Sequence, residues 1–402
     1  MSSADPPGSL GKSPLILFVQ PFGFSEPGGG PRIYRALLET SPIPFHSVVT
    51  SPEPPRAPRF GTQTHLPRYP SLGRIEHTRF CWIAKYYEFY RLADFERNIE
   101  KLISDCNPTA VHVLAHAIDC FAAARAAKRK KLSVFLTVHD DTVYHYQNLF
   151  LSSRVDSQMR ELWSTVDHRF VISAAIGEEY NRRYGDRPFT LVTDGASSLA
   201  TLFDPSERKE GSIYFCGLFH FGYEQNLTAL LQVGALQAKL GKTSSNMFKL
   251  SFRCGSLGPI SMPDGVDLQV LPFADESVVN EEMSKASLLY LPMKFDEKDS
   301  AFSRFSLPTK MISYLASGRP IFYHGPSNSA AADLLRKHDA AIMCYSLEPD
   351  EIAKCLQVSM EEQTRVASNA LRLAGQEFML HSQRDKFWTP ILQKLGCSHL
   401  CN

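Results

Sequence analysis

Residues 305–321 read FSLPTKMISYLASGRPI, a pattern that predicts a loop, a helix and a strand in succession. Pro308 is tolerated in a first helical turn, and Gly318 and Pro320 end the helix before a strand that begins at Ile321. Three apolar residues share the inward face of this helix, and they are Met311, Ile312 and Leu315. The stretch is therefore typical of an α/β protein with parallel strands.

A helix that begins beyond the carboxyl end of a strand is where open parallel sheets bind their ligands. The unpaired amides of its first turn carry partial positive charge that suits phosphate, and Lys310 adds a full charge. Pro308, Thr309 and Lys310 are therefore candidate ligands of a phosphate group. The same residues fit an ordinary strand-to-helix connection in which Lys310 is merely solvated.

The remainder of the chain repeats this α/β pattern. At 402 residues it is long enough for two hydrophobic cores, and short aliphatic runs alternate with amphipathic helical patterns. Strands are predicted in the first half at 15–20, 45–49, 110–114, 132–139, 168–173 and 190–192. In the second half they are predicted at 212–216, 248–252, 268–271, 288–291, 321–324 and 341–344.

The predicted domain limits follow from this alternation. They are a disordered lead at 1–13, a first domain at 14–200, a second domain at 201–375, and a C-terminal helix at 376–402 that packs on the first domain. The stretch 51–79 is rich in Pro, Arg and Gly and lacks apolar periodicity, so it is predicted to be an insertion or a mobile loop.

Composition excludes several classes of function. The 43 Lys and Arg residues balance 42 Asp and Glu residues, so no overall field attracts nucleic acid. The nine cysteines have no paired spacing and no histidine pair has the spacing of zinc ligands, so no metal site and no disulfide framework are expected. No signal peptide precedes the first strand and no apolar run is long enough to span a membrane, which favours the cytoplasm.

The 305–321 segment resembles the Pro-x-Lys-x-x-Glu-Tyr-Leu-Ala-x-Gly-x-Pro motif of the family 4 type of GT-B glycosyltransferases. Other segments that are similar to this family occur in the expected order over most of 14–375. They are Gly28-Gly29-Gly30, His139-Asp140, the helix from Ser173 to Tyr184, Gly217, and His324-Gly325-Pro326. The resemblance implies a GT-B fold, with two facing Rossmann-like domains, a cleft between them and a C-terminal helix that crosses back.

The resemblance also implies roles for particular residues. The first domain would take the acceptor and the second would hold a nucleotide sugar. His139 would contact the transferred sugar or act on a proton, with Asp140 orienting it, although a satisfied core histidine fits the same pattern. Gly29 and Gly30 would let the backbone approach the donor or the acceptor, although a triple glycine also suits a flexible turn.

The sequence departs from the family where chemistry matters. Ser313 stands where the family usually has a glutamate for the donor ribose, and Phe305 stands at the partner acidic position eight residues earlier. The arginine and lysine that commonly follow Gly217 are absent as well. Because a departing diphosphate needs positive charge, we expect Lys310 and Arg304 to supply it, with Arg253 as a further candidate.

Acceptor recognition has a separate candidate region. The basic loop at 56–79 precedes a helix that carries five aromatic side chains, Trp82, Tyr86, Tyr87, Phe89 and Tyr90. This combination fits a lipid phosphate or a peripheral contact with a membrane surface. A solvated loop and core-facing aromatic residues would explain the same sequence.

The leading hypothesis is a metal-independent glycosyltransferase of the hexosyltransferase kind, with catalytic residues His139 and Asp140. Its donor is a nucleotide-diphosphate sugar, no other cofactor is expected, and its acceptor is a glycan, a lipid-linked molecule or a small molecule. From the resemblance we expect cell-envelope or exopolysaccharide biosynthesis, in the cytoplasm or at the inner face of the cell membrane. The alternatives are a catalytically silent GT-B-like binding or scaffold protein and a nucleotide-sugar epimerase.

Overall fold

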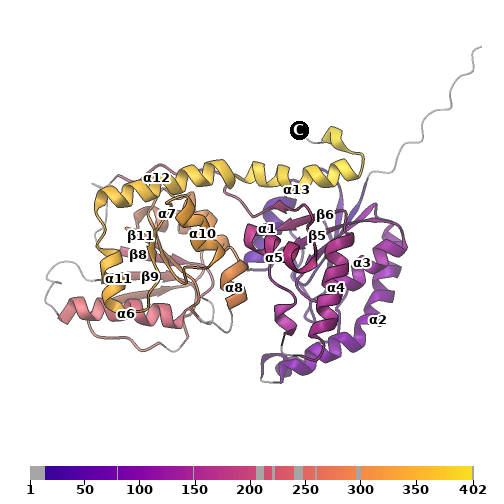
Figure 1. The fold of residues 1–402 in the computed structure, drawn as a ribbon, viewed down its shortest axis with the longest axis horizontal. Helices are drawn as coiled ribbons and strands as arrows, with labels where there is room; N and C mark the ends of the chain where they lie inside the picture. The colour runs from indigo at the N-terminus through magenta and orange to yellow at the C-terminus, as the bar shows by residue number, and fades with distance from the viewer. Residues whose placement is uncertain are drawn as a thin grey trace, which may run out of the picture.

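The computed structural model describes residues 14–78, 80–147, 149–204, 212–219, 222–239, 248–258, 260–295 and 300–400. The predicted lead at 1–13 lies outside these residues. Within them the chain forms two parallel β-sheets, each covered by helices on both faces, which lie side by side along the long axis of the molecule (Figure 1).

The elements of the first half alternate as the sequence predicts. The strands are β1 (Ile16–Gln20), β2 (Phe45–Val49), β3 (Thr62–His65), β4 (Ala110–Ala115), β5 (Ser133–Val138), β6 (His168–Val171) and β7 (Thr190–Leu191). The helices are α1 (Gly29–Leu38), α2 (Cys81–Cys106), α3 (Asp119–Arg129), α4 (Ser152–Thr165) and α5 (Ala174–Tyr184), with 3₁₀ turns η1 (Gly73–His77) and η2 (Tyr144–Tyr146).

The second half repeats the pattern and then becomes helical. Its strands are β8 (Ser212–Cys216), β9 (Phe248–Arg253), β10 (Val266–Leu271), β11 (Leu288–Pro292), β12 (Ile321–His324) and β13 (Ile342–Cys344). Its helices are α6 (Glu224–Lys239), α7 (Glu276–Lys285), α8 (Ser300–Phe305), α9 (Thr309–Leu315), α10 (Ala330–Lys337), α11 (Pro349–Leu356), α12 (Met360–Glu377) and α13 (Leu380–Lys394), followed by the 3₁₀ turn η5 (Ser398–Leu400).

Both sheets have the doubly wound order of a nucleotide-binding fold. The first runs β3-β2-β1-β4-β5-β6-β7 and the second runs β10-β9-β8-β11-β12-β13. The strand order therefore reverses beside β1 in the first sheet and beside β8 in the second. Ligands of such sheets bind at the carboxyl ends of the strands at these reversal points, which directs attention to the loops that follow β1 and β8.

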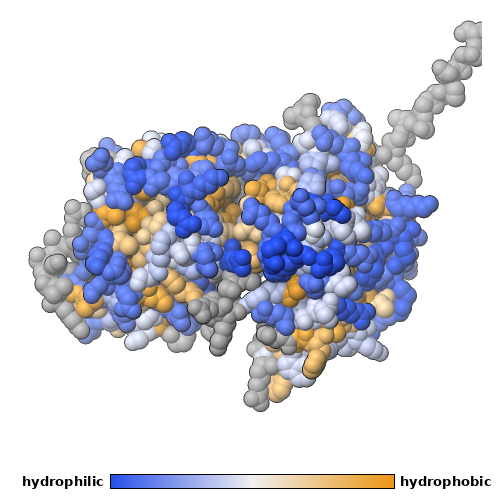
Figure 2. All heavy atoms as spheres, viewed as in Figure 1, coloured by the Kyte–Doolittle hydropathy of each residue, from blue (hydrophilic) through white to orange (hydrophobic). Residues whose placement is uncertain are grey.

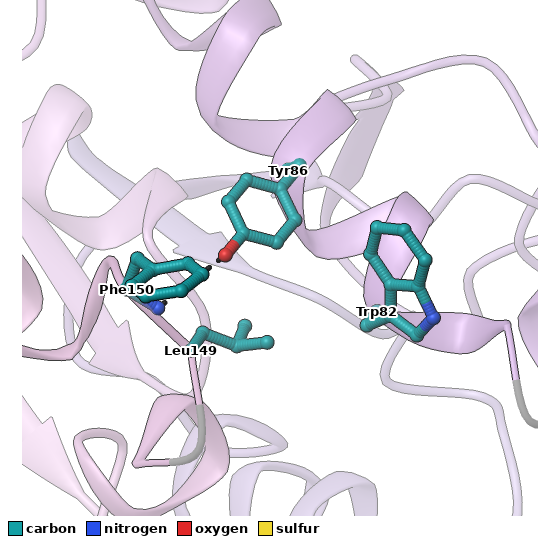
Figure 3. A pocket seen from close by; sticks show the side chains of 4 residues that line it. All are labelled: Trp82, Tyr86, Leu149 and Phe150. Atoms are coloured by element: carbon teal, nitrogen blue, oxygen red, sulfur yellow. Dashed lines mark hydrogen bonds between the residues drawn. The ribbon is translucent and has the colours of Figure 1, made fainter.

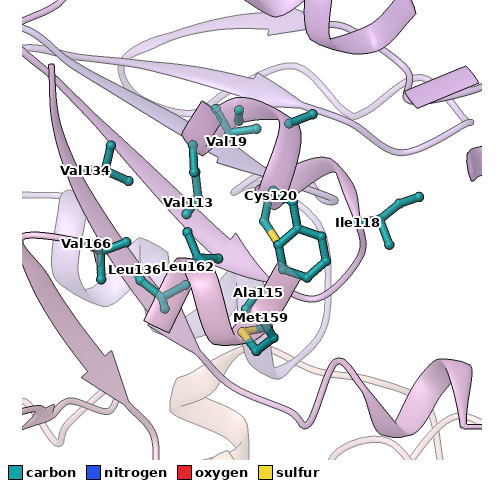
Figure 4. Close-up of a cluster of buried hydrophobic side chains, with 14 of the residues drawn as sticks. Val19, Val113, Ala115, Ile118, Cys120, Val134, Leu136, Met159, Leu162 and Val166 are labelled. Carbon is teal, nitrogen blue, oxygen red and sulfur yellow. The ribbon is translucent and has the colours of Figure 1, made fainter. Parts of the chain in front are cut away.

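Each sheet is buried between two apolar layers. In the first domain, α2 to α5 cover one face, where strand residues such as Val113 and Leu136 pack against Met159 and Leu162 of α4 (Figure 4). The opposite face packs against α1 and α13. Burial of aliphatic side chains on both faces explains why the strands read as continuous apolar runs.

The last two helices join the domains. In Figure 1, α12 and α13 run end to end over both halves. α12 packs on the second domain through Leu373 and Ala374, whereas α13 inserts Phe387 and Trp388 into the core of the first domain. The Trp388 Nε1 donates a hydrogen bond to the carbonyl of Leu37, 2.9 Å away. The predicted C-terminal helix that crosses back is confirmed.

The predicted strands are confirmed to within two residues, and one strand was missed. The stretch 51–79 was predicted to be an insertion or a mobile loop, but it contains β3, which pairs in parallel with β2. The pairing is reinforced because the His46 ring nitrogens lie 2.7 and 2.9 Å from the hydroxyls of Thr62 and Thr64. None of the helices in the described ranges combines the length and the apolar content that a membrane span requires.

Candidate active site

The glycine loop after β1 lies against the second domain. Gly28 has a φ of +122°, and a Cβ on Gly30 would lie 2.7 Å from the ring of Phe22, so neither position accepts a side chain without strain. A Cβ on Gly29 would lie 3.3 Å from Thr309 Cγ2 at the start of α9. The loop is therefore a packed contact between the two domains, and it brings α1 and α9 together.

Arg32, in the first turns of α1, bridges the two domains. Its Nη2 donates a hydrogen bond to Ser313 Oγ at 2.7 Å, and its Nε lies 2.6 Å from Asp194 Oδ2. Asp194 is buried, which raises the pKa of its carboxyl group, and the charge of Arg32 opposes that rise. Ser313, at the family's glutamate position, thus accepts a hydrogen bond from an arginine of the other domain.

The loop between α8 and α9 forms a second bridge. Phe305 belongs to α8 but is buried in the apolar core of the first domain. Ser173 Oγ donates a hydrogen bond to the Phe305 carbonyl, and Ser306 Oγ donates one to Asp140 Oδ1 at 2.9 Å. The phenylalanine at the family's other acidic position therefore joins the domains through packing.

His139 follows β5 and faces the ring of Tyr34 at a centroid distance of 5.7 Å. The residue is 7% exposed, and its Nε2 has no hydrogen-bond partner among the described residues. Burial lowers the pKa of His139 to about 4, so the imidazole is neutral at pH 7. A buried polar atom without a partner costs about 1–3 kcal/mol, and Nε2 is such an atom; the role of His139 as a sugar contact or a core histidine stays a prediction.

Lys310 lies beneath the loop that follows β8, in a largely aromatic site. Its Nζ is 4.0 Å from the ring centroid of Phe215 and 5.2 Å from that of Tyr223, and it donates a 3.4 Å hydrogen bond to the carbonyl of Leu218. A Cβ on Gly217, whose φ is +108°, would lie 3.5 Å from Lys310 Cε. Burial lowers the pKa of Lys310 to about 7. The alternative of a solvated Lys310 is therefore wrong.

The other predicted cations occupy different surroundings. Arg253, at the end of β9, forms a salt bridge with Glu282, with its Nε 2.5 Å from Oε2, and it also donates to the Pro272 carbonyl. This pairing holds its guanidinium within the second domain. Arg304 is exposed and stacks over the Phe305 ring at 5.1 Å. Pro308 is the N-cap of α9 and leads directly into the Thr309 contact with Gly29.

Three contributors to this cleft were missed from sequence, namely Arg32, Asp194 and Ser306. The dipeptide Asp194-Gly195 is typical of a turn, and no sequence motif marks Arg32. The available signal was the position of Arg32 three residues after Gly29, in the helix that follows a glycine loop.

His116, after β4, lies near Asp140, with Nδ1 3.8 Å from Oδ2.

Comparisons with known proteins bear on the family and on the fold. Residues 45–195 match the family model described as Glycosyltransferase Family 4. A curated relative is the pre-glycoprotein polyprotein GP complex of Tacaribe virus (strain Franze-Fernandez), which is 26% identical over 126 residues. That match covers 27% of this chain and 25% of the relative, so the chain spans about a quarter of the relative's length.

Solved structures resemble the chain over nearly its whole length. They include an α,α-trehalose 6-phosphate synthase from Burkholderia multivorans (TM-score 0.61, 12% identity, 96% of this chain and 98% of that one). MurG from Acinetobacter baumannii has a TM-score of 0.56 at 12% identity, covering 95% and 99% of the two chains. A UDP-N-acetylglucosamine 2-epimerase from Listeria monocytogenes, itself assigned provisionally, has a TM-score of 0.57 at 11% identity, covering 96% and 97%.

At these identities the solved structures establish the fold, and residues 45–195 add a likeness to Glycosyltransferase Family 4. The chain is a GT-B fold protein that resembles the glycosyltransferases of family 4.

Proposed function

We propose that this protein transfers a sugar from a nucleotide-diphosphate sugar to an acceptor in the cleft between its domains. The observation that carries the proposal is that three features follow the carboxyl ends of strands in the two sheets. These are the glycine loop, the unpartnered imidazole of His139, and the cations Lys310 and Arg32. The family match of the first domain supports the same class of reaction.

The diphosphate is held by cations of both domains. In the reaction the bond between the sugar's anomeric carbon and the diphosphate oxygen breaks, and negative charge develops on the leaving group. Lys310, beneath the Gly217 loop, and Arg32, fixed by Asp194, supply the opposing charge. This arrangement requires no metal ion at the diphosphate. Arg304, exposed beside Phe305, is a peripheral contributor.

The transferred sugar is held from the first domain. The neutral imidazole of His139 presents Nε2 to a sugar hydroxyl or to the acceptor proton that is lost as the new bond forms. Asp140 follows it and is fixed by Ser306 of the other domain. Because both acidic positions of the family motif are replaced here, product stereochemistry is a separate measurement, made by NMR of the anomeric proton.

The acceptor has an apolar part that binds at the tip of the first domain. Trp82 and Tyr86 of α2 line a cavity of about 630 Å³ with Leu149 and Phe150, where the Phe150 amide donates to the Tyr86 hydroxyl (Figure 3). Trp82 is 48% exposed and Phe150 98% exposed, and apolar atoms gather at this end of the surface in Figure 2. Core-facing aromatic residues do not account for these two exposures. The surface supports a lipid-linked acceptor presented at a membrane, as in envelope or exopolysaccharide synthesis.

A thermal-shift screen tests the proposal. The purified protein is heated with a panel of nucleoside diphosphates and nucleotide sugars, because a ligand that binds the native state raises the melting temperature by mass action. A selective shift that is reduced in both Lys310→Ala and Arg32→Ala variants supports the proposal and identifies the donor class. No shift at millimolar concentrations, or a shift that both variants show at the size seen in the parent protein, refutes this donor site.

A second candidate, a catalytically silent binding or scaffold protein, has its own observation. The positions of the family's two acids are Phe305 and Ser313, and both make contacts that join the domains. This candidate predicts no nucleotide shift and retention of a protein partner. An epimerase, the other alternative, would interconvert a nucleotide sugar with no acceptor present.

A further inference from the structure

A cluster of side chains of the types that bind metal ions lies at the carboxyl ends of the central strands of the first sheet. His116 follows β4, Asp140 follows β5, and His145 belongs to η2. One ligand atom from each residue lies within 4.8 Å of the others, and the rings of His116 and His145 are 5.7 Å apart. Among the described residues this is the group of three such side chains whose ligand atoms converge.

The chemistry of the cluster suits a borderline divalent cation. Two imidazoles and one carboxylate are a ligand set typical of zinc, and a fourth position stays open to water. Around a tetrahedral zinc ion, ligand atoms lie roughly 3.3 Å apart, and the distance from His116 Nδ1 to Asp140 Oδ2 is 3.8 Å. His145 is exposed, and its ligand atom already lies within 4.8 Å of those of His116 and Asp140.

The carboxylate is already oriented for this role. Asp140 Oδ1 accepts the hydrogen bond of Ser306, which leaves Oδ2 on the side of His116. Hydrogen bonds of this kind to a ligating carboxylate fix its direction and strengthen metal binding. Because Ser306 belongs to the second domain, an ion at this site would be coupled to the contact between the domains.

The positive charges near the cluster are partly offset by carboxylates. Arg68 and Lys85 lie within electrostatic reach of His116 and would oppose a divalent ion. Glu88 is buried against both, with its carboxylate oxygens 3.0 Å from Arg68 Nε and 3.8 Å from Lys85 Nζ. One carboxylate thus offsets part of the charge of the two cations, and the carboxylate of Asp140 faces the two imidazoles.

We propose that His116, Asp140 and His145 bind one divalent transition-metal ion, zinc in the first instance. The ion holds Asp140 in place for its hydrogen bond from Ser306 of the second domain and thereby favours the closed cleft. This role is distinct from stabilisation of the leaving diphosphate, which the proposal above assigns to Lys310 and Arg32. The site requires no glycosyl transfer, so its test reads metal binding directly.

The test uses the full chain, purified without a histidine tag and stripped with a chelator. Calorimetry with Zn²⁺ is expected to give one equivalent bound. Titration with Co²⁺ is expected to give visible d–d bands without a sulfur-to-cobalt charge-transfer band, because no thiol is a ligand. His116→Ala and His145→Ala are each expected to abolish binding at concentrations that saturate the parent protein.

Two controls separate this site from adventitious binding. His399→Ala and Cys81→Ser remove an exposed imidazole and an exposed thiol elsewhere, and both are expected to leave the titration unchanged. Ser306→Ala is expected to weaken Zn²⁺ binding on the order of 10-fold. Ser317→Ala, which removes a hydroxyl bonded to backbone groups within the second domain, is expected to leave zinc affinity unchanged. Binding that survives both histidine variants, or no binding at all, overturns the proposal.

Discussion

The two halves of the molecule each bury a histidine at the carboxyl end of a central strand, and the two histidines differ in one respect. His324, the last residue of β12, has both ring nitrogens partnered, Nδ1 with the Tyr290 hydroxyl at 2.9 Å and Nε2 with the Ser346 carbonyl at 2.8 Å. His139, after β5, has no partner at Nε2 among the described residues. Burial lowers the pKa of both to about 4.

His139 and His324 are both buried but differ in their hydrogen bonds, and this difference indicates two different roles for a buried histidine. A fully bonded imidazole stabilises the fold that surrounds it. An imidazole with an unpartnered nitrogen costs stability and leaves that nitrogen available to a ligand. The first half therefore has a buried imidazole nitrogen without a partner where the second half has a structural hydrogen bond, and the proposed sugar contact of His139 rests on this difference.

The largest expected effect is on catalysis. We expect His139→Leu to lower kcat by on the order of 100-fold or more with the donor that the thermal-shift screen identifies, because a positioned proton-transfer or hydrogen-bonding group contributes that much. His324→Leu, measured on folded protein at the same temperature, is expected to keep kcat within a few-fold. Equal losses in the two variants would remove the distinction between the histidines.

For the free energy of unfolding, we expect the larger loss in His324→Leu and not in His139→Leu. His324→Leu leaves the Tyr290 hydroxyl and the Ser346 carbonyl without their partner, so the free energy of unfolding is expected to fall by about 2 kcal/mol. His139→Leu removes a buried atom that had no partner, and its unfolding free energy is expected to be unchanged or higher. Urea denaturation followed by circular dichroism measures both. A clear loss in His139→Leu would mean that Nε2 is satisfied in solution.

Two cations of the second domain also differ in how they respond to pH. Lys310 has a pKa of about 7, whereas Arg253, paired with Glu282, has its pKa raised by that hydrogen-bonded pair. Binding of an anionic diphosphate favours charged Lys310. Donor affinity is therefore expected to be full below pH 7 and to fall as pH rises above it, by up to about tenfold per pH unit.

Isothermal titration with a nucleotide sugar between pH 6 and pH 9 measures this dependence, because its diphosphate has no proton to lose in that range. Lys310→Met is expected to bind more weakly and to show no such slope. Arg304→Met removes an exposed cation and is expected to keep the slope. A slope that persists in Lys310→Met would assign the titration to another group.

Much of the fold could be predicted because apolar runs, helix faces and glycine stops are local properties of the sequence. The helix predicted from residues 305–321 has its apolar face buried at Met311, Ile312 and Leu315. β3 could not be predicted, because residues 62–65 are polar and half-exposed and their pairing depends on His46 of another strand. An edge strand held by side-chain hydrogen bonds has no apolar periodicity.

The site could be predicted only in part. Resemblance pointed to His139 and Lys310, but the unpartnered Nε2 and the aromatic surroundings of Lys310 arise from residues far apart in the chain. The bridge from Arg32 to Ser313 joins residues separated by 281 positions, and no local pattern encodes how two domains dock. For the same reason, the spacing of histidines along the chain gave no indication of the His116 cluster.

The smallest expected effect concerns that docking. Ser313→Ala removes the hydrogen bond from Arg32 while leaving the Arg32–Asp194 pair intact, so the closed arrangement should lose about 1 kcal/mol. Amides in the first turns of α1 that exchange through domain opening are then expected to exchange hydrogen about fivefold faster. Ser317→Ala is the matched control, because its hydroxyl bonds only to backbone groups within the second domain.

Equal rates in Ser313→Ala and the parent protein would mean that Phe305 and Ser306 hold the domains without this bond. In that case the serine at the family's glutamate position would be left to contact the donor ribose, as the glutamate does in the family.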